Sequence, residues 1–350
     1  MKKITAYSCI LLAAMSLLTG CKSNDNKGDN TGDNTGDTAG VTQGAEATKA
    51  PDSGTTDVDV IYVDDTELAM TQPVWDEGFE AYMYQGVFYS VDDTAMEASA
   101  VDYYGVDMAE FDIPETLDCD GKVYTVTSIG DEAFYYYEGL EKITIAQTVK
   151  SIGEDAFYGC ELLSEVVFGS GLTSIGDAAF YGCNALTSVN IPEGVVSMGS
   201  EVFCSCIGLE SITLPSTLKV IGDEAFFGCE VLESITIPAS VTKLSYGIFT
   251  NCYSLSEVIL PEGLTTIGES AFWECPELTS ITLPESLVSI EEDAFYSSGL
   301  ESITIPANTT DIAESAFDFC DYLTTIYVPE DLHSYFSDLF EYADFEVTAY

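Results

Sequence analysis

The amino-acid sequence predicts an α/β-type solenoid, a stack in which short strands alternate with short helical turns. The first observation is a phenylalanine that recurs every 23 residues over more than half of the chain. The second is that the residues around it repeat one pattern of apolar, small and acidic positions. The third is a hydrophobic share of 46%, which is enough for a large core. The phased positions, the last of which follows after 22 residues, are Phe134, Phe157, Phe180, Phe203, Phe226, Phe249, Phe272, Phe295 and Phe317.

Each repeat combines a strand with a predicted helical turn. The unit is I-G-x-x-A-F-x-x-C-x-x-L-x-x-I-x-I-P-x-x-V, and one full copy runs from Ile221 to Val241. Ile235 and Ile237 alternate with polar residues, which predicts a short strand, and Pro238 ends it because proline cannot donate to a strand ladder. Acidic residues before the Ala-Phe pair favour the start of a helical turn. One unit cannot bury its apolar face alone, so the units must stack, about 4.8 Å apart.

This repeated motif is similar to the BspA-like leucine-rich repeats, a family of bacterial and protist surface proteins. The resemblance covers roughly residues 111–329. It implies a leucine-rich-repeat-like stack. It also implies adhesion or recognition at the cell surface, often of host matrix or of other cells, which the periodicity by itself does not show.

The repeats also delimit the terminal segments. Nine repeats of 22–23 residues occupy residues 129–328. Residues 73–128 are interpreted as degenerate repeats that form an N-terminal cap, because a solenoid needs its open ends closed. Residues 329–350 are expected to form a C-terminal cap, and the helical spacing of Leu332, Phe336 and Leu339 predicts a helix there.

The N-terminal residues resemble the signal sequence of a bacterial lipoprotein. Residues 1–20 combine a basic start with an apolar run too short to span a bilayer, which is typical of a signal peptide. They lead into Leu18-Thr19-Gly20-Cys21, which looks like a lipobox in which Cys21 is lipidated; the alternative is an ordinary signal peptide with an incidental cysteine. Residues 21–72 are rich in Asn, Asp, Gly and Thr and predict a flexible linker. We therefore expect a monomer anchored by lipid to the extracellular face of the bacterial cell membrane.

The charge of the chain is strongly negative. Sixty acidic residues face ten lysines, and with no arginine the net charge is −50. Such a surface repels nucleic acid and anionic lipid, so we expect no nucleic-acid partner and membrane contact only through the lipid anchor. A single histidine, His333, leaves few groups for nucleophilic catalysis or phosphate binding. We therefore predict no catalytic residues and no enzyme activity.

Equivalent positions of the repeats form columns, and one column is cysteine. Disulfides between neighbours are conceivable at the spacing of a stack. We favour buried free thiols with a structural role, because Tyr137 and Ser298 replace cysteine in two repeats and the column is not paired. The sequence contains no C-x-x-C motif of the kind that would indicate a zinc site. The members are Cys160, Cys183, Cys206, Cys229, Cys252, Cys275 and Cys320.

A second column is acidic and precedes the Ala-Phe pair. Stacked carboxylates suggest a ladder of divalent-cation sites, whereas negative charge at the start of a helical turn is the plainer interpretation. The absence of a recognisable calcium motif favours the plainer one. We expect no cofactor, with calcium as the alternative. The members are Asp131, Glu154, Asp177, Asp223, Glu269, Glu292 and Glu314.

Two further columns are candidates for a binding surface. An aromatic residue follows the repeated phenylalanine; it either packs against the neighbouring turn or forms an exposed patch of the kind that anchors interfaces. Threonine recurs on the outward side of the strand and suits a flat, neutral face. The aromatic positions are Tyr135, Tyr158, Tyr181, Phe227, Trp273 and Tyr296, and the threonines are Thr144, Thr213, Thr236, Thr282 and Thr304.

These observations together predict a non-catalytic, cell-surface-anchored leucine-rich-repeat protein that mediates adhesion or protein–protein recognition. Solenoids present long surfaces, which suits that role. The expected partners are proteins or glycans of the host matrix or of other cells. The alternative is a structural or calcium-dependent protein of the cell envelope, in which the acidic column holds the ion.

Overall fold

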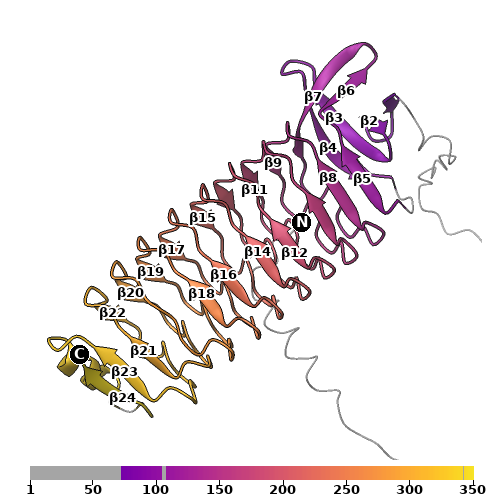
Figure 1. Cartoon of the computed structure of the whole chain (residues 1–350). Coiled ribbons are helices and arrows are strands. Elements are labelled where there is room, and N and C mark those ends of the chain that lie inside the picture. Colours follow the sequence, from indigo (N-terminus) through magenta and orange to yellow (C-terminus); the bar gives the residue numbers. More distant parts are fainter. Residues whose placement is uncertain (1–71, 105–107, 342) are drawn as a thin grey trace, which may run out of the picture. The chain divides into compact units, whose positions relative to one another are not determined.

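The computed structural model describes residues 72–104, 108–341 and 343–350. Through the repeats, each coil of the chain contributes one strand of two residues, and most coils add one of three or four (Figure 1). The two kinds of strand stack into two columns, which confirms the predicted solenoid. The expected signal peptide, the lipid anchor at Cys21 and the linker up to residue 71 lie outside the described residues.

The long-strand column comes from the S-I-T-I-P part of the repeats. Its strands pair in parallel, and partner residues in neighbouring repeats are 23 positions apart, as with Ser188 and Ser211. The alternation of apolar and polar residues puts the middle side chain inward and its neighbours outward. The strands are β5 (Glu110–Ile113), β8 (Lys142–Ile145), β10 (Glu165–Val167), β12 (Ser188–Asn190), β14 (Ser211–Thr213), β16 (Ser234–Thr236), β18 (Glu257–Ile259), β21 (Ser302–Thr304), β23 (Thr325–Val328) and β24 (Glu346–Ala349).

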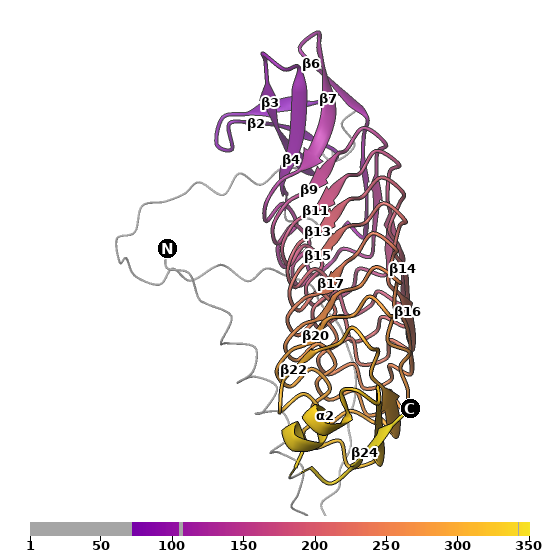
Figure 2. The same cartoon turned by 90° about the vertical axis from the view of Figure 1, so that its left-hand side faces the viewer.

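The short-strand column runs along another side of the same coils (Figure 2). Its members come directly before the position that glycine holds in most of the repeats. Each has only two residues, the second of which is buried. They also pair in parallel, as Ile267 does with Ile290. The strands are β9 (Ser151–Ile152), β11 (Ser174–Ile175), β13 (Ser197–Met198), β15 (Val220–Ile221), β17 (Lys243–Leu244), β19 (Thr266–Ile267), β20 (Ser289–Ile290) and β22 (Asp311–Ile312).

The repeated phenylalanines form a continuous stack through the core. From Phe134 to Phe295 they are fully buried, and Phe317 is 3% exposed. Neighbouring ring centroids lie 5.1 to 6.0 Å apart with interplanar angles of at most 19°. Offset stacking at this distance adds to the burial of each large side chain. The 23-residue phase is therefore the phase of the core.

The predicted helical turns are wrong. The segment around each repeated phenylalanine is a series of turns without helix. The residue two after the phenylalanine has positive φ in every repeat, and the residue two before it has positive φ in every repeat except that of Phe317; in the first repeat these are Tyr136 at 53° and Glu132 at 58°. Left-handed residues four positions apart prevent an α-helix from continuing. They turn alternate amides toward the next coil instead: Phe134 N donates to Ala156 O at 2.7 Å, and Glu132 and Tyr136 do likewise. Hydrogen bonds between coils thus replace those within a helix.

The segment before the repeats is mostly antiparallel, which corrects the expectation of degenerate repeats. Strands β1 to β4 form consecutive antiparallel pairs, and β6 pairs with β7 in the same way. Only β5 and the C-terminal end of β7 pair with strands of the repeat columns. The strands not yet given are β1 (Val74–Asp76), β2 (Ala81–Tyr84), β3 (Val87–Asp92), β4 (Glu97–Tyr103), β6 (Thr116–Cys119) and β7 (Lys122–Ile129).

The C-terminal segment differs from the helical cap that was expected. The single helix among the described residues is α2 (His333–Leu339), in which Phe336 is buried. The chain then forms β24, which pairs in parallel with β23 and so adds one more strand to the long-strand column. The helical spacing found a real helix, but a strand follows it because Val347 can still extend the ladder beside Ile326.

Candidate functional site

The outward face of the long-strand column carries exposed side chains on successive strands. In β12, β14, β16 and β18 the middle residue is buried and both neighbours are exposed. The parallel register aligns Asn190 with Thr213 and Thr236 with Ile259, so equivalent positions lie side by side. Of the five predicted threonines, Thr213, Thr236, Thr282 and Thr304 are exposed and Thr144 is half-buried. The structure brings all five to one face.

This row is interrupted next to β18. On one side β18 pairs with β16, but residues 280–283, which follow in the column, form no strand. Within the column Ile237 N donates to Ile259 O at 2.9 Å. The equivalent bond, from Leu260 N to Thr282 O, does not form, and in the described part of the chain no main-chain hydrogen bond joins β18 to residues 280–283. Pairing is also interrupted between β10 and β12.

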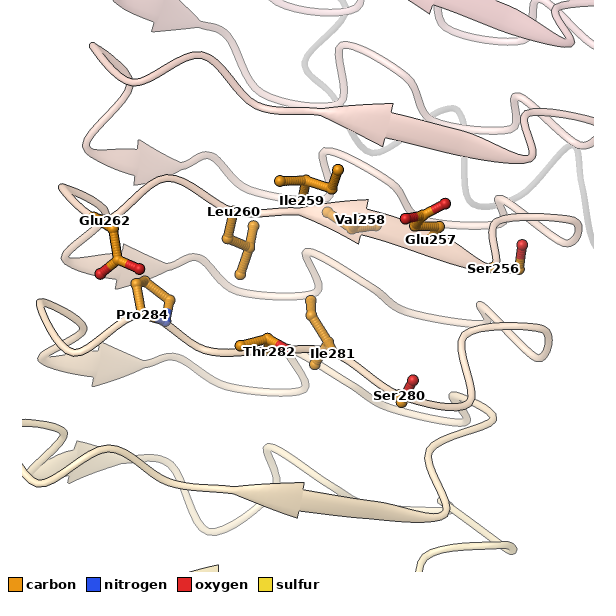
Figure 3. A pocket seen from close by; sticks show the side chains of 10 residues that line it. All are labelled: Ser256, Glu257, Val258, Ile259, Leu260, Glu262, Ser280, Ile281, Thr282 and Pro284. Carbon is orange, nitrogen blue, oxygen red and sulfur yellow. The ribbon is translucent and has the colours of Figure 1, made fainter.

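A cleft of about 370 Å³ opens at the interruption beside β18 (Figure 3). We call it the β18 cleft. Glu262 and Pro284 lie at one end of it, and Ser256 and Ser280 lie at the other (Figure 3). Its lining residues are Ser256, Glu257, Val258, Ile259, Leu260 and Glu262 on one side, and Ser280, Ile281, Thr282 and Pro284 on the other.

Two sequence features coincide with the β18 cleft. The coil that follows residues 280–283 is one residue shorter than the others, between Phe295 and Leu300. Its Gly299 donates to Cys275 O at 3.1 Å and lies so close to Pro276 that any side chain there would collide with the proline carbonyl. The next coil thus bonds to the start of this coil, and no main-chain hydrogen bond from it reaches residues 280–283 in the described part of the chain. Of the residues that line the cleft, only Thr282 was among the predicted candidates for a binding surface.

The aromatic column is divided into two stacks. Tyr158 and Tyr181 stack with ring centroids 4.4 Å apart, and Tyr135 joins them at 5.2 Å. Trp273 and Tyr296 stack at 3.9 Å. Each stack offers partly exposed ring surface, because Tyr135 is 39% exposed and the others are half-buried.

Phe227, one of the candidates for an exposed binding surface, is buried. Its side chain is 9% exposed, and Cys204 and Thr250, at the same position in the neighbouring repeats, are also buried. The column therefore loses its exposed rings between Tyr181 and Trp273. An extended aromatic patch does not form, and the two stacks are separate surfaces.

Members of the acidic column bind the main chain of the next coil. Asp131 accepts a hydrogen bond from Glu154 N at 3.0 Å, and Asp177 accepts one from Ser200 N at 2.8 Å. Asp223 accepts from Tyr246 N at 3.1 Å. Each of these carboxylates is thus partly satisfied by an amide of the protein itself. The structure thus gives these aspartates a role between coils that the sequence did not predict.

Other members and neighbours of the acidic column contribute charge. Glu154, Glu269, Glu292 and Glu314 are exposed. Burial raises the pKa of Glu269, and the nearby Glu292 adds to the rise. Burial also raises the pKa of Asp155, the residue that follows Glu154, to about 6. Like charges in a row resist ionisation, so this side of the stack carries repulsion at neutral pH.

The cysteine column lies inside the stack. All nine cysteines in the described residues are free thiols, and all but the half-buried Cys320 are buried. Each thiol in the column donates to the carbonyl oxygen of a phenylalanine in the preceding coil, as Cys206 does to Phe180 O at 3.1 Å. Burial raises the pKa of Cys206 to about 12. Such thiols are poor nucleophiles and poor metal ligands.

The described residues contain no cluster of His, Cys, Asp and Glu arranged to hold a metal ion. His333 begins α2, and its Nε2 lies 3.2 Å from Val347 O. Within residues 72–104, 108–341 and 343–350, no helix is both long and apolar enough to cross a membrane.

Known proteins resemble the chain over its repeats. The family model of the BspA type leucine rich repeat region matches residues 127–256 and 244–348, in six copies. Among solved structures, the leucine rich repeat protein of T. pallidum is 28% identical, with a TM-score of 0.52, over 56% of this chain and 89% of that chain.

Two further solved structures are similar in sequence but align less closely in space. A leucine rich cell surface protein from Faecalibacterium prausnitzii is 25% identical over 71% of this chain and 94% of that one, with a TM-score of 0.35. The pneumococcal vaccine antigen PcpA is 22% identical over 72% of this chain and 82% of that one, with a TM-score of 0.42. The comparison with curated proteins gave no match.

Proposed function

This chain belongs to the BspA type leucine-rich repeat family, and from that premise we propose that it is a non-catalytic recognition protein of the bacterial cell surface. It binds partner proteins through the outward face of the long-strand column and thereby mediates adhesion. Its partners are proteins or glycans of the host matrix or of other cells.

The observation that carries the proposal is the outward face itself. Thr213, Thr236 and Ile259 are exposed and lie in register on successive strands. Short hydroxyl and apolar side chains give a flat face that a partner can approach closely and with little loss of side-chain entropy. The buried middle residues, such as Ile235, hold the face rigid, so little ordering remains to be done on binding.

The surface location rests on the N-terminal residues. The basic start, the apolar run and the Leu-Thr-Gly-Cys sequence together support lipidation of Cys21. Two or more acyl chains hold a protein stably on a membrane. The linker of residues 21–72 would then allow the repeats to reach beyond the membrane surface.

The contacts favour recognition over a calcium-dependent envelope role. Asp131, Asp177 and Asp223 each use a carboxylate oxygen to accept an amide hydrogen bond from the next coil. They are thus partly satisfied by the protein itself. A calcium titration separates the two roles: we expect 5 mM calcium to change the melting temperature by less than about 1 °C, whereas a structural calcium ladder would raise it by several degrees.

The test of recognition is a binding measurement on immobilised fibronectin, laminin, collagen and whole cells. We expect saturable capture of the protein by at least one of these. The double variant Thr213→Glu/Thr236→Glu adds two charges to the outward face and should weaken capture at least tenfold. The matched control is Val220→Glu/Val288→Glu, which adds two charges at exposed positions, one in β15 and one just before β20, that are 57% and 45% exposed respectively.

Three outcomes contradict the proposal. Absence of saturable capture on every surface removes adhesion. Equal weakening by both double variants shows that the added charge, and not the outward face, is responsible. A Cys21→Ser change is expected to release the protein from cells. Unchanged retention at the membrane would contradict the lipid anchor.

A further inference from the structure

We propose that a pocket at the N-terminal end of the repeats binds the guanidinium group of an arginine residue in a partner protein. We call it the Tyr135 pocket. It has a volume of about 520 Å³ and is lined by Val101, Asp102, Tyr103, Asp131, Glu132 and Tyr135. The inference rests on the proposed recognition role and deepens it, because it names a chemical group of the partner and a second place that holds it.

The pocket lies where the chain before the repeats leaves the path of the coils. Ala100 of β4 pairs in parallel with Ile129 of β7, and Gly130 N donates to Ala100 O at 2.7 Å, as between successive coils. Beyond this point β4 does not turn as a repeat does. Its last residues continue as a strand beside β3, where Asp102 pairs with Phe88. The first turn of the repeats therefore has no turn before it, and the Tyr135 pocket occupies this position.

The first argument is a set of main-chain acceptors that the repeats leave open. From the second repeat onward, the carbonyl oxygen of the residue after the repeated phenylalanine accepts an amide of the preceding coil, as Tyr158 O does from Tyr136 N at 2.7 Å. The equivalent atom of the first turn is Tyr135 O. In the described part of the chain no main-chain amide donates to it or to Asp131 O. Both oxygens belong to residues that line the pocket, so they offer acceptors to a donor-rich ligand.

The second argument is charge. Asp102, Asp131 and Glu132 bring three carboxylates to the pocket, and no lysine lines it. One oxygen of Asp102 accepts from Tyr103 N, and one oxygen of Asp131 accepts from Glu154 N, which leaves a second oxygen of each for a ligand. Asp102 is half-buried, and burial raises the pKa of its carboxyl group. A cation in the pocket would relieve this unfavourable charge.

The third argument is the ring of Tyr135, which ends the first aromatic stack. Tyr158 stacks on it at 5.2 Å between ring centroids, and Tyr136 meets it edge to face at 4.7 Å. The side chain is still 39% exposed and lines the pocket. A planar guanidinium can lie on such a ring while its N–H groups reach the surrounding carboxylates and carbonyls. An ammonium group lacks this flat face, so the site favours arginine over lysine.

The experiment is a ligand-observed NMR titration of the whole protein against the end-capped pentapeptide Gly-Ser-Arg-Ser-Gly. We expect saturable binding. A peptide with citrulline in place of arginine keeps the shape and loses the charge, so it should bind at least tenfold more weakly. A lysine peptide keeps the charge and loses the planar group, so it should bind about threefold more weakly.

Variants of the protein place the peptide in the Tyr135 pocket. Asp102→Asn/Glu132→Gln removes two carboxylates with little change in shape and should weaken binding about fivefold. The matched control, Glu161→Gln/Glu210→Gln, removes two exposed charges that do not line the pocket and should leave binding unchanged. Tyr135→Ala should weaken binding about threefold, and Tyr135→Phe, which retains the ring, should recover most of that loss.

Four results overturn the inference. Absence of saturable binding removes the site, and equal binding of the citrulline peptide removes the role of charge. Equal binding of the lysine peptide shows that no guanidinium is selected. Equal weakening by the two carboxylate variants shows that the net charge of the protein, and not the pocket, attracts the peptide. A failed titration with successful capture on the immobilised surfaces refutes the pocket and retains the recognition role, whereas the reverse supports the pocket and removes adhesion.

Discussion

The thiol of Cys229 donates a hydrogen bond to the main-chain carbonyl oxygen of Phe203, with 3.2 Å between sulfur and oxygen. The two residues are 26 positions apart and lie in neighbouring coils. The same contact recurs along the column, from Cys160 with Phe134 O to Cys320 with Phe295 O. The cysteines therefore do more than fill space, because each one ties its coil to the coil before it.

Replacing Cys229 tests this tie. Cys229→Ala loses the donor and leaves a small cavity, so we expect the free energy of unfolding to fall by about 1–2 kcal/mol. Cys229→Ser retains a donor toward Phe203 O and should cost less. Urea denaturation followed by circular dichroism measures both. If serine is the more destabilising of the two, burial of the sulfur matters more than its hydrogen bond.

The thiols should resist alkylation in the native protein. Burial raises the pKa of Cys160 and Cys275 to about 12, so at pH 8 almost none of either is the reactive thiolate. Cys320 is less buried and should react first among the described cysteines. Iodoacetamide labelling with peptide mass mapping checks this order. Rapid labelling of Cys160 or Cys275 without denaturant would show that the coils open readily.

Stability should fall as the pH rises from about 4 to 6. Burial raises the pKa of Asp155 to about 6 from an ordinary value of 3.8, and the neighbouring Glu154 and Glu132 add to the rise. The folded state then binds more protons than the unfolded state in this window, so deprotonation favours unfolding. Burial also raises the pKa of Glu201, which has the same sign. We expect a higher urea midpoint at pH 5 than at pH 7.5.

The Asp155→Asn variant isolates one contribution to this pH dependence. It removes the charge and keeps the shape, and asparagine tolerates the positive φ of 54° at this position. Its urea midpoint at pH 7.5 should exceed that of the natural protein. The exposed Glu161→Gln serves as control and should change little. A midpoint for Asp155→Asn that is lower at pH 7.5 would contradict the sign.

The Asp177 carboxylate should stabilise the stack through its hydrogen bond and not through its charge. Asp177 Oδ1 accepts from Ser200 N at 2.8 Å. Both Asp177→Asn and Asp177→Ala remove the charge, but only asparagine keeps an acceptor. We expect alanine to be less stable than asparagine by about 1 kcal/mol in thermal and urea unfolding. Equal stability of the two variants would mean that the hydrogen bond contributes nothing.

The left-handed turn positions should select against β-branched residues. Ser205 has a φ of 58°, whereas glycine occupies the same position in other repeats, as at Gly182 and Gly228. Ser205→Gly relieves the strain and should leave stability unchanged or slightly higher. Ser205→Val should destabilise the protein by about 1–2 kcal/mol. Comparable stability of the two variants would indicate that this turn relaxes without cost.

The sequence determined the period, the direction of most side chains and the identity of the core. Phe226, Cys229, Leu232 and Ile235 are buried as their places in the repeat predicted. A recurring 23-residue pattern suffices for this because every coil meets a near-copy of itself, so one buried position implies its equivalents. Only the family resemblance suggested recognition at a surface.

The tertiary structure alone decided how the coils meet. Whether the turn at Glu132 and Tyr136 becomes a helix depends on the neighbouring coil, which accepts their amides at 2.8 and 2.7 Å and makes two left-handed residues acceptable. Likewise, Thr282 has the sequence environment of a strand residue but belongs to no strand and lines a cleft. Hydrogen bonds between coils are non-local, so a pattern read within one repeat cannot determine them.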